Sequence, residues 1–202
     1  MTSTVRRIGV LGGAFDPPHV AHVALGRAAV EQLQLDSLLV LPTGRAWHKT
    51  RDLTGSEHRL AMARLAFAEL SVALVDDRET RRAGPTYTVD TLRELQAEHP
   101  QAELFLILGK DQGDVLSSWH KWELIPQFAI ICVADRADQG EVKDRFVPPA
   151  SLRERFRSLQ MPRMPVSATD IRSRISKHQD HALLVSEPVA RYIDQHHLYP
   201  SA

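Results

Sequence analysis

Short apolar runs alternate along the chain with longer segments in which apolar residues recur at helical spacing. Several of the runs are continuous rather than alternating, which is expected of parallel strands whose two faces are both covered by helices. The strands that this pattern predicts are Arg7–Leu11, Ser37–Leu41, Val72–Val75, Leu104–Leu108 and Phe128–Ala134.

Helical patterns fill the spaces between these strands. Thr54 and Glu57 fit a capping box, and Ser186 is expected to be an N-cap with Pro188 in the first turn. The alternation predicts an α/β, Rossmann-like fold with a doubly wound parallel sheet in three α/β/α layers, and its ligand beyond the strand carboxyl ends. The helices expected are Val20–Leu33, Ser56–Leu70, Thr88–Glu98, Thr169–Lys177 and Ser186–His197.

Length and composition agree with a single domain. The 202 residues are 43% hydrophobic, enough for a substantial core, and we expect residues 1–202 to form one domain with a surface insertion near 135–165. Lys plus Arg equals Asp plus Glu, which argues against a general nucleic-acid binder. The lone Cys132 lies in an apolar run and excludes an internal disulfide.

Membrane and secretory segments are not expected. No apolar stretch reaches the roughly 18 residues that span a bilayer. The chain passes directly from Arg6-Arg7 into the first strand, which leaves no room for a signal peptide. We therefore expect a reducing, cytoplasmic setting.

Candidate chemistry is concentrated in the segment from Gly12 to His22, which joins the first strand to the first helix. Glycines allow a bound group to approach the backbone, and the free N–H groups of a helix N-terminus favour an anion. His19 and His22 share one face of the helix at this point. The combination predicts a phosphate site. A simple tight turn is the plainer reading, and a zinc site would need further ligands that stand at no convincing spacing.

A second helix start carries a similar set of groups. Ser167 and Thr169 are each able to cap the helix, and Arg172 follows one turn later. Alone, this is an ordinary N-cap. Hydroxyls, free N–H groups and an arginine also form an anion cradle, so two such helix starts could grip a polyphosphate from two sides.

These two motifs together resemble the nucleotidylyltransferase superfamily, which carries paired HxGH and SxTxxR signatures. Within it, nearly the full length is similar to the bacterial nicotinate-nucleotide adenylyltransferases. Further matching segments are His48-Lys49, Pro85 to Leu92, Gly109-Lys110-Asp111, Ser118 to Glu123, and the ending Tyr192-Ile193 with Leu198-Tyr199.

The resemblance implies that the phosphate of nicotinate mononucleotide attacks the α-phosphate of ATP, giving deamido-NAD and pyrophosphate, with Mg²⁺ accompanying ATP and no metal ligand from the protein. It implies catalytic roles for His19, His22, Arg172 and Lys49. The ATP-binding residues that it implies are Gly12, Gly13, Ala14, Phe15, Gly109, Asp111, Ser167, Thr169 and Ile171.

For the acceptor, the resemblance implies contacts from His48, Tyr87, Thr88, Trp119 and His120. In the family, the tryptophan at the position of Trp119 stacks on the nicotinate ring, and backbone N–H groups at Thr88 and His120 receive the carboxylate. Read without the family, Asp111 is equally a loop residue that caps a turn. Trp119, together with Trp122 three residues later on a helix, is equally part of a core.

Three positions depart from the family pattern. Ala14 stands where many members have Thr or Ser, Ala21 replaces the glycine of HxGH, and Ala46-Trp47 stands where relatives often carry two prolines. The nearest alternative is a nicotinamide-mononucleotide or other small-molecule nucleotidylyltransferase. A non-catalytic nucleotide-binding regulator is an alternative of another class. A dehydrogenase is disfavoured because the first turn is not GxGxxG.

Overall fold

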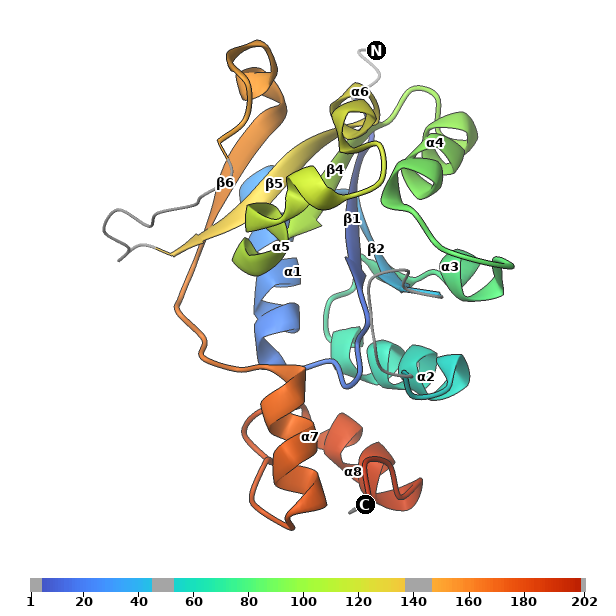
Figure 1. Ribbon diagram of the computed structural model, residues 1–202, viewed down its shortest axis with the longest axis vertical. Coiled ribbons are helices and arrows are strands. Elements are labelled where there is room, and N and C mark those ends of the chain that lie inside the picture. Colours follow the sequence, from blue (N-terminus) through green and yellow to red (C-terminus); the bar gives the residue numbers. More distant parts are fainter. Residues whose placement is uncertain (1–4, 45–52, 137–146, 201–202) are drawn as a thin grey trace.

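A single six-stranded parallel sheet forms the centre of the molecule (Figure 1). The computed structural model describes residues 5–44, 53–136 and 147–200. The strand order is β3-β2-β1-β4-β5-β6, which is that of a doubly wound Rossmann-like sheet and confirms the expected fold class. The strands are β1 (Arg7–Gly13), β2 (Ser37–Pro42), β3 (Ala73–Val75), β4 (Glu103–Leu108), β5 (Ala129–Arg136) and β6 (Phe156–Met161).

Helices cover both faces of the sheet and create two separate cores. One core packs α1, α2, α7 and α8 against the sheet through residues such as Leu25, Phe67 and Ile193. The other packs α4 and α6 on the opposite face through residues such as Leu92 and Ile125. The longer helices are α1 (Val20–Leu33), α2 (Ser56–Phe67), α4 (Thr88–Glu98), α7 (Ala168–Ser176) and α8 (Glu187–Gln195), and the shorter ones are α3 (Arg78–Arg81), α5 (Lys110–Asp114) and α6 (Ile125–Phe128).

The central strands β1, β2 and β4 are apolar after their first residues, as expected where helices cover both faces of the sheet. In β1, Val10 pairs with Leu39 on one side and Leu106 on the other, and its side chain is 2% exposed. The five predicted strands are all present, with ends that differ by one or two residues. Phe128, for example, closes α6 instead of opening β5.

The sixth strand corrects our reading of the segment 135–165 as a surface insertion, because Phe156–Met161 pairs with β5 as the edge strand of the sheet. Only Leu159 of this strand is fully buried. Because most of the strand is not fully buried, it needs few apolar residues, and it lacks the apolar run that marks the inner strands. The side chain of Gln32 in α1 bonds the Gln160 backbone, with its Nε2 2.7 Å from the carbonyl oxygen and its Oε1 3.0 Å from the amide nitrogen. These two bonds give partners to backbone groups at the edge of the sheet, which would otherwise be available to pair with another strand.

Two local predictions were wrong. The N-cap of α2 is Gly55 rather than Thr54, without a side-chain capping bond, and Thr54 is used elsewhere. Trp119 and Trp122 do not share a helix, because the chain turns at Lys121 with a φ of 51° between two separate 3₁₀ turns. Ser186 is the N-cap of α8, as expected, with Pro188 in its first turn.

Among the residues described, no helix combines the length and the apolar character that crossing a bilayer requires.

Candidate active site

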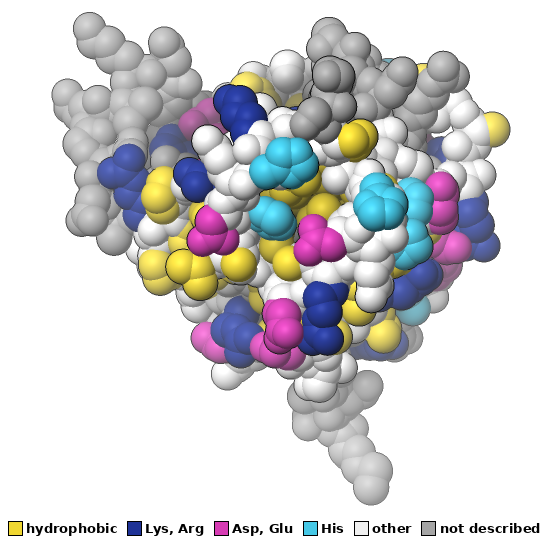
Figure 2. Space-filling model, turned by 90° about the horizontal axis from the view of Figure 1, so that it is seen from below, with side chains coloured by type: hydrophobic (Ala, Val, Ile, Leu, Met, Phe, Trp, Pro, Cys, Tyr) yellow, Lys and Arg dark blue, Asp and Glu magenta, His cyan; other side chains and the backbone are white. Residues whose placement is uncertain are grey.

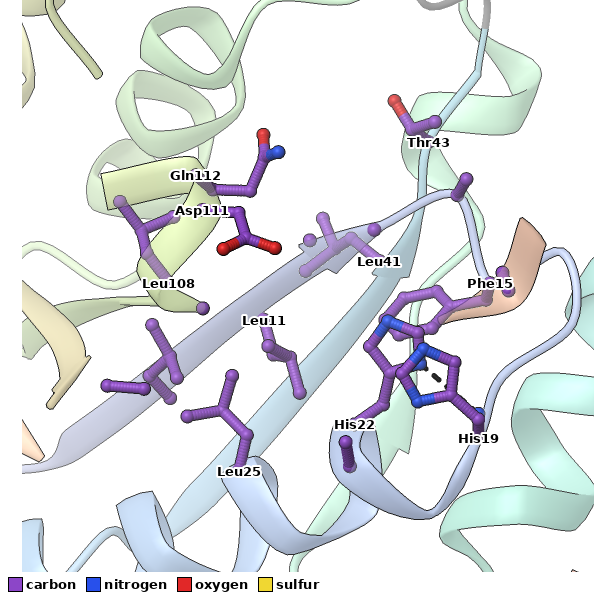
Figure 3. Close-up of a pocket in the computed structure, with 18 of the residues that line it drawn as sticks. Leu11, Phe15, His19, His22, Leu25, Leu41, Thr43, Leu108, Asp111 and Gln112 are labelled. Carbon is purple, nitrogen blue, oxygen red and sulfur yellow. Dashed lines mark hydrogen bonds between the residues drawn. The ribbon is translucent and has the colours of Figure 1, made fainter. Parts of the chain in front are cut away.

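A cavity of about 800 Å³ opens at the carboxyl ends of β1, β2 and β4 (Figure 3). This volume is in the range that holds a nucleotide-sized ligand. The position is also the one at which doubly wound sheets bind ligands, since the strand order reverses there. Its wall contains the turn after β1, the end of β2, the β4–α5 turn, the start of α4 and the segment from Met161 to Arg172.

The turn after β1 is shaped by two glycines and one strained residue. A Cβ on Gly12 would meet nothing within 4 Å, so the backbone here faces open cavity. A Cβ on Gly13 would lie 3.1 Å from the Phe15 ring, which folds back beneath the turn. Phe15 adopts a φ of 47° and is 1% exposed, with its ring edge-on to His22 at 5.0 Å and to Phe67 at 5.9 Å. The turn therefore presents bare backbone to a ligand above an aromatic support.

His19 and His22 form a stacked pair at the start of α1. Their ring centroids lie 3.7 Å apart with an interplanar angle of 22° (Figure 3). His19 is the N-cap, and its backbone N–H donates to Nδ1 of His22 at 3.2 Å. Because Nδ1 of His22 accepts this bond, a neutral His22 carries its proton on Nε2.

His19 is held in its neutral form by burial. Its side chain lines the cavity, the residue is 8% exposed, and desolvation lowers its pKa from 6.5 to about 4. Its buried Nδ1 has no hydrogen-bond partner among the described residues. An orphaned polar atom beside an open cavity is what a missing ligand or water would satisfy.

Arg172 reaches the same turn from α7. Its Nη1 donates to the backbone oxygen of Asp16 at 2.8 Å across 156 residues of sequence, and its Nη2 donates to Thr169 Oγ1 at 3.1 Å. Ser167 is the N-cap, and its Oγ accepts from the Asp170 amide at 3.1 Å. The two predicted helix starts therefore do converge on one cavity.

Asp16 is a member of the site to which the sequence assigned no role. Its side chain is 1% exposed, and its two carboxylate oxygens accept from the Tyr199 hydroxyl at 2.7 Å and the Thr54 amide at 3.3 Å. Burial, and then the negative charge of Asp16, raises the pKa of Tyr199. Asp16 lies within the first motif, but its partners are distant in the sequence. No sequence pattern identifies them as partners of Asp16.

The far end of the cavity is aromatic and polar. The rings of Tyr87 and His120 lie 4.1 Å apart with an angle of 30° between them, and Trp119 packs against the α4-side core. Thr88 is the first residue of α4, where backbone N–H groups have no acceptor within the helix.

Glu79 and Thr86 also line this end and were missed. Glu79 accepts from Thr91 Oγ1 at 2.8 Å, and burial raises its pKa. Thr86 Oγ1 is buried and unpaired within the described part of the chain. Both residues come from segments without a strong periodic pattern, so only packing reveals them.

The turn after β4 places Asp111 at the cavity, where it is exposed beside Gln112 (Figure 3). Gly109 is the N-cap of the short helix α5, and Lys110 pairs with Asp114 at 2.8 Å. Seen from below, histidines lie beside a hollow with a hydrophobic floor, among mixed basic and acidic side chains (Figure 2). No single charge dominates this face, so anion binding would depend on local groups.

With one exception, the predicted site residues in the described ranges line this cavity. The exception is Ile171, which is 0% exposed in the core beside α1 and α2. His48 and Lys49, and the Ala46-Trp47 departure, lie outside the described residues. Ala14 and Ala21 also line the cavity, and Ala21 is accommodated within α1.

Comparisons with known proteins show the family to which the chain is similar. Residues 10–174 match the model of the cytidylyltransferase-like family. A probable nicotinate-nucleotide adenylyltransferase of Albidiferax ferrireducens is 60% identical over 98% of this chain and 100% of its own length. One of the same name from Methylibium petroleiphilum is 40% identical over 98% of this chain and 94% of its own length.

Solved structures show the same fold at low sequence identity. The Plasmodium falciparum nicotinic acid mononucleotide adenylyltransferase, complexed with NaAD or with APC, superposes with a TM-score of 0.74. It is 20% identical, over 96% of this chain and 97% of its own. At this identity the likeness supports the fold and not the individual site residues.

Proposed function

This chain belongs to the cytidylyltransferase-like family, as a nicotinate-nucleotide adenylyltransferase, and from that premise we propose how its cavity transfers the adenylyl group. An oxygen of the phosphate of nicotinate mononucleotide attacks the α-phosphorus of ATP. The bond between the α-phosphorus and the bridging oxygen to the β-phosphorus breaks. The products are deamido-NAD and pyrophosphate.

The observation that carries this proposal is the convergence of the two helix starts. The His19–His22 pair and Arg172 meet around the Gly12–Asp16 turn, although Arg172 and Asp16 are 156 residues apart. A triphosphate bound here would face bare backbone at Gly12, imidazole nitrogens on one side and a guanidinium on the other. These are the groups that stabilise charge on a transferring phosphoryl group.

No general base is required, because the attacking phosphate is already ionised near neutral pH. Catalysis then depends on alignment of the two substrates and on stabilisation of charge. In this proposal His22 donates from Nε2 to a phosphate oxygen, and neutral His19 donates one ring N–H. Arg172 holds the β- and γ-phosphates as pyrophosphate leaves, and Lys49 adds charge from outside the described residues.

The adenosine and the acceptor would occupy the two ends of the cavity. For ATP we propose contacts from Asp111, Ser167 and Thr169 in addition to the glycine turn, and no direct contact from the buried Ile171. For nicotinate mononucleotide, we propose stacking on Trp119 beside the Tyr87–His120 pair.

The acceptor's carboxylate would be received by backbone N–H groups of Thr88 and His120, with His48 beside it. Donors aimed at this group favour the acid over the amide, because the amide also presents an N–H₂ donor.

Mg²⁺ would enter with ATP. Magnesium is usually bound through substrate phosphates, one or two carboxylates and several waters, and there it neutralises developing phosphate charge. The described residues contain no group of three or more His, Cys, Asp or Glu that could hold a metal ion. We propose that the phosphates of ATP hold the ion.

We also propose that the whole chain acts as one catalytic domain, since all six described strands belong to one sheet. A cytoplasmic location is proposed from the single cysteine, Cys132, which is buried in the core.

Pyrophosphate release from ATP, with each acceptor offered separately, tests the proposed function. Nicotinate mononucleotide should support turnover with a kcat/KM at least about tenfold above that of the amide, as expected when a site's polar groups are left mismatched. Equal values would show that the N–H groups at Thr88 and His120 do not select the acid. Turnover only with an unrelated phosphate acceptor would reject the assigned substrate.

A further inference from the structure

Arg59 is a buried arginine that lies outside the cavity and holds three backbone segments together. It is part of α2 and is 3% exposed. Its Nη1 donates to the carbonyl oxygens of Ala14 at 3.0 Å and Thr43 at 2.8 Å, and its Nε donates to that of Thr54 at 2.8 Å. Long charged side chains are rarely this buried, and their burial is costly unless bonds compensate.

Two of the three acceptors belong to the cavity wall. Ala14 is part of the glycine turn, and Thr43 follows β2. The Thr43 amide in turn donates to the Gly13 oxygen at 2.8 Å. One guanidinium nitrogen therefore bridges the end of β1 to the end of β2 at the floor of the site.

The position of the bond to Ala14 matters because the next residue is strained. Phe15 has a φ of 47°, a conformation that residues with a side chain rarely adopt. Such residues keep this conformation only where surrounding contacts impose it. The Phe15 ring is fixed by its contacts with His22 and Phe67, and the carbonyl just before it is fixed by Arg59.

We propose that Arg59 is a positioning residue for adenylyl transfer, which fixes the Ala14–Phe15 backbone so that the turn presents its N–H groups to the triphosphate of ATP. The inference rests on the proposed function. Arg59 does not line the cavity, so its effect reaches ATP through Ala14 and Thr43. Its bonds to Ala14, Thr43 and Thr54 do not reach the Tyr87–His120 pair at the acceptor's end of the cavity.

We expect that a lysine cannot perform the role of Arg59, although it keeps the positive charge. Three carbonyls are bonded through two nitrogens of a rigid planar group, Nε and Nη1. A lysine offers a single nitrogen on a flexible stem and cannot occupy both positions. The Arg59→Lys variant therefore separates the effect of the hydrogen-bond geometry of Arg59 from the effect of its charge.

The test measures the binding of MgATP and of nicotinate mononucleotide by calorimetry, the KM of each, kcat, and thermal unfolding. The variants are Arg59→Lys and Arg59→Ala, with Arg64→Ala as the control, because Arg64 is exposed on the same helix. A second readout adds guanidinium at low, non-denaturing concentration to the alanine variants.

We expect Arg59→Lys to raise the Kd and the KM for MgATP about tenfold, the cost of losing one bond from a charged donor. The Kd for nicotinate mononucleotide should stay within about twofold, as for a site that is not coupled to the change. Guanidinium should restore part of the ATP affinity of Arg59→Ala and leave Arg64→Ala unchanged.

Wild-type ATP affinity in Arg59→Lys, or equal weakening of both ligands, would overturn the inference. If Arg59→Ala does not fold, Arg59→Lys alone decides. A wild-type protein that binds MgATP but forms no deamido-NAD would contradict the proposed function. The ATP affinities of the Arg59 variants would still decide the role of Arg59.

Discussion

The hydroxyl of Tyr199, near the C-terminus, donates a 2.7 Å hydrogen bond to Oδ1 of Asp16, 183 residues earlier in the chain. The backbone oxygen of the same Asp16 accepts from Arg172 at 2.8 Å. One buried aspartate therefore joins the glycine turn, the arginine of α7 and the C-terminal segment. Because the glycine turn and Arg172 line the cavity, we expect changes at Tyr199 to affect catalysis.

Tyr199→Phe removes one hydroxyl and leaves the ring. We expect the free energy of unfolding to fall by about 1–3 kcal/mol, because the buried Asp16 carboxylate loses the hydrogen bond from the Tyr199 hydroxyl. kcat should fall as well, since Asp16 also positions Arg172. Urea unfolding and steady-state kinetics measure the two effects. Tyr192→Phe is the matched control: its hydroxyl lies 3.0 Å from His58 Nδ1 and away from the cavity. An equal loss of kcat in that variant would contradict the role of Asp16.

The two glycines of the turn should respond differently to alanine. In Gly12→Ala the new methyl group meets nothing within 4 Å and enters the cavity, so the fold should be unaffected while the KM for ATP rises. In Gly13→Ala the methyl group lies 3.1 Å from the Phe15 ring, and stability should fall by about 1–3 kcal/mol. Thermal unfolding and ATP titration of the pair distinguish these effects. A loss of stability in Gly12→Ala together with a raised KM for ATP in Gly13→Ala would show that the turn faces the other way.

Arg172→Lys should lower kcat about 100-fold or more, by analogy with the loss of one preorganised charge-stabilising donor. The lysine keeps a charge but cannot reproduce the fork that bonds the Asp16 oxygen and Thr169 Oγ1 together. Arg174→Lys is the control, since Arg174 is exposed on the same helix and pairs with Asp170. Rapid-quench measurement of the chemical step is the appropriate readout, and a wild-type rate in Arg172→Lys would reject the assignment.

The stability of the protein should depend on pH through His19. Its folded pKa of about 4 lies below the ordinary histidine value of 6.5, so the unfolded chain binds a proton between these values that the folded chain does not. The free energy of unfolding therefore falls as the pH falls from about 6.5 to about 4, by as much as about 3 kcal/mol from this group.

Urea unfolding across this pH range, compared with His19→Gln, measures the contribution. The glutamine variant should lose less stability on acidification, whereas His178→Asn, at an exposed site, should follow the wild type. Titration of the His19 ring by NMR is an independent check. A midpoint near 6.5 would contradict the burial effect.

Much of the fold follows from local patterns. The inner strands β1, β2 and β4 are apolar after their first residues, Arg7, Ser37 and Glu103, and α1 begins and ends at the residues that the helical spacing predicted. Edge strand β6 was not predicted, because with one fully buried residue it has almost no apolar signal. Its place in the sheet is set by its pairing with β5.

The candidate site divides in the same way. The sequence assigned His19, His22 and Arg172 to the candidate site through two motifs, and it predicted acceptor contacts through a family resemblance. It did not predict the hydrogen bonds through which Asp16 and Arg59 join distant segments. It also did not predict that Glu79 and Thr86 line the cavity. Each of these depends on partners that are distant in sequence or on burial.

The sequence alone determined the α/β class and the strand–glycine–helix unit at 12–22, and it predicted an anion site there, because periodicity, backbone freedom and helix ends are local properties. Only the tertiary structure decided that Arg172 and Tyr199 meet at Asp16, and that burial keeps His19 neutral. Contacts across more than 150 residues and the exclusion of water depend on how the whole chain packs, and no local pattern encodes them.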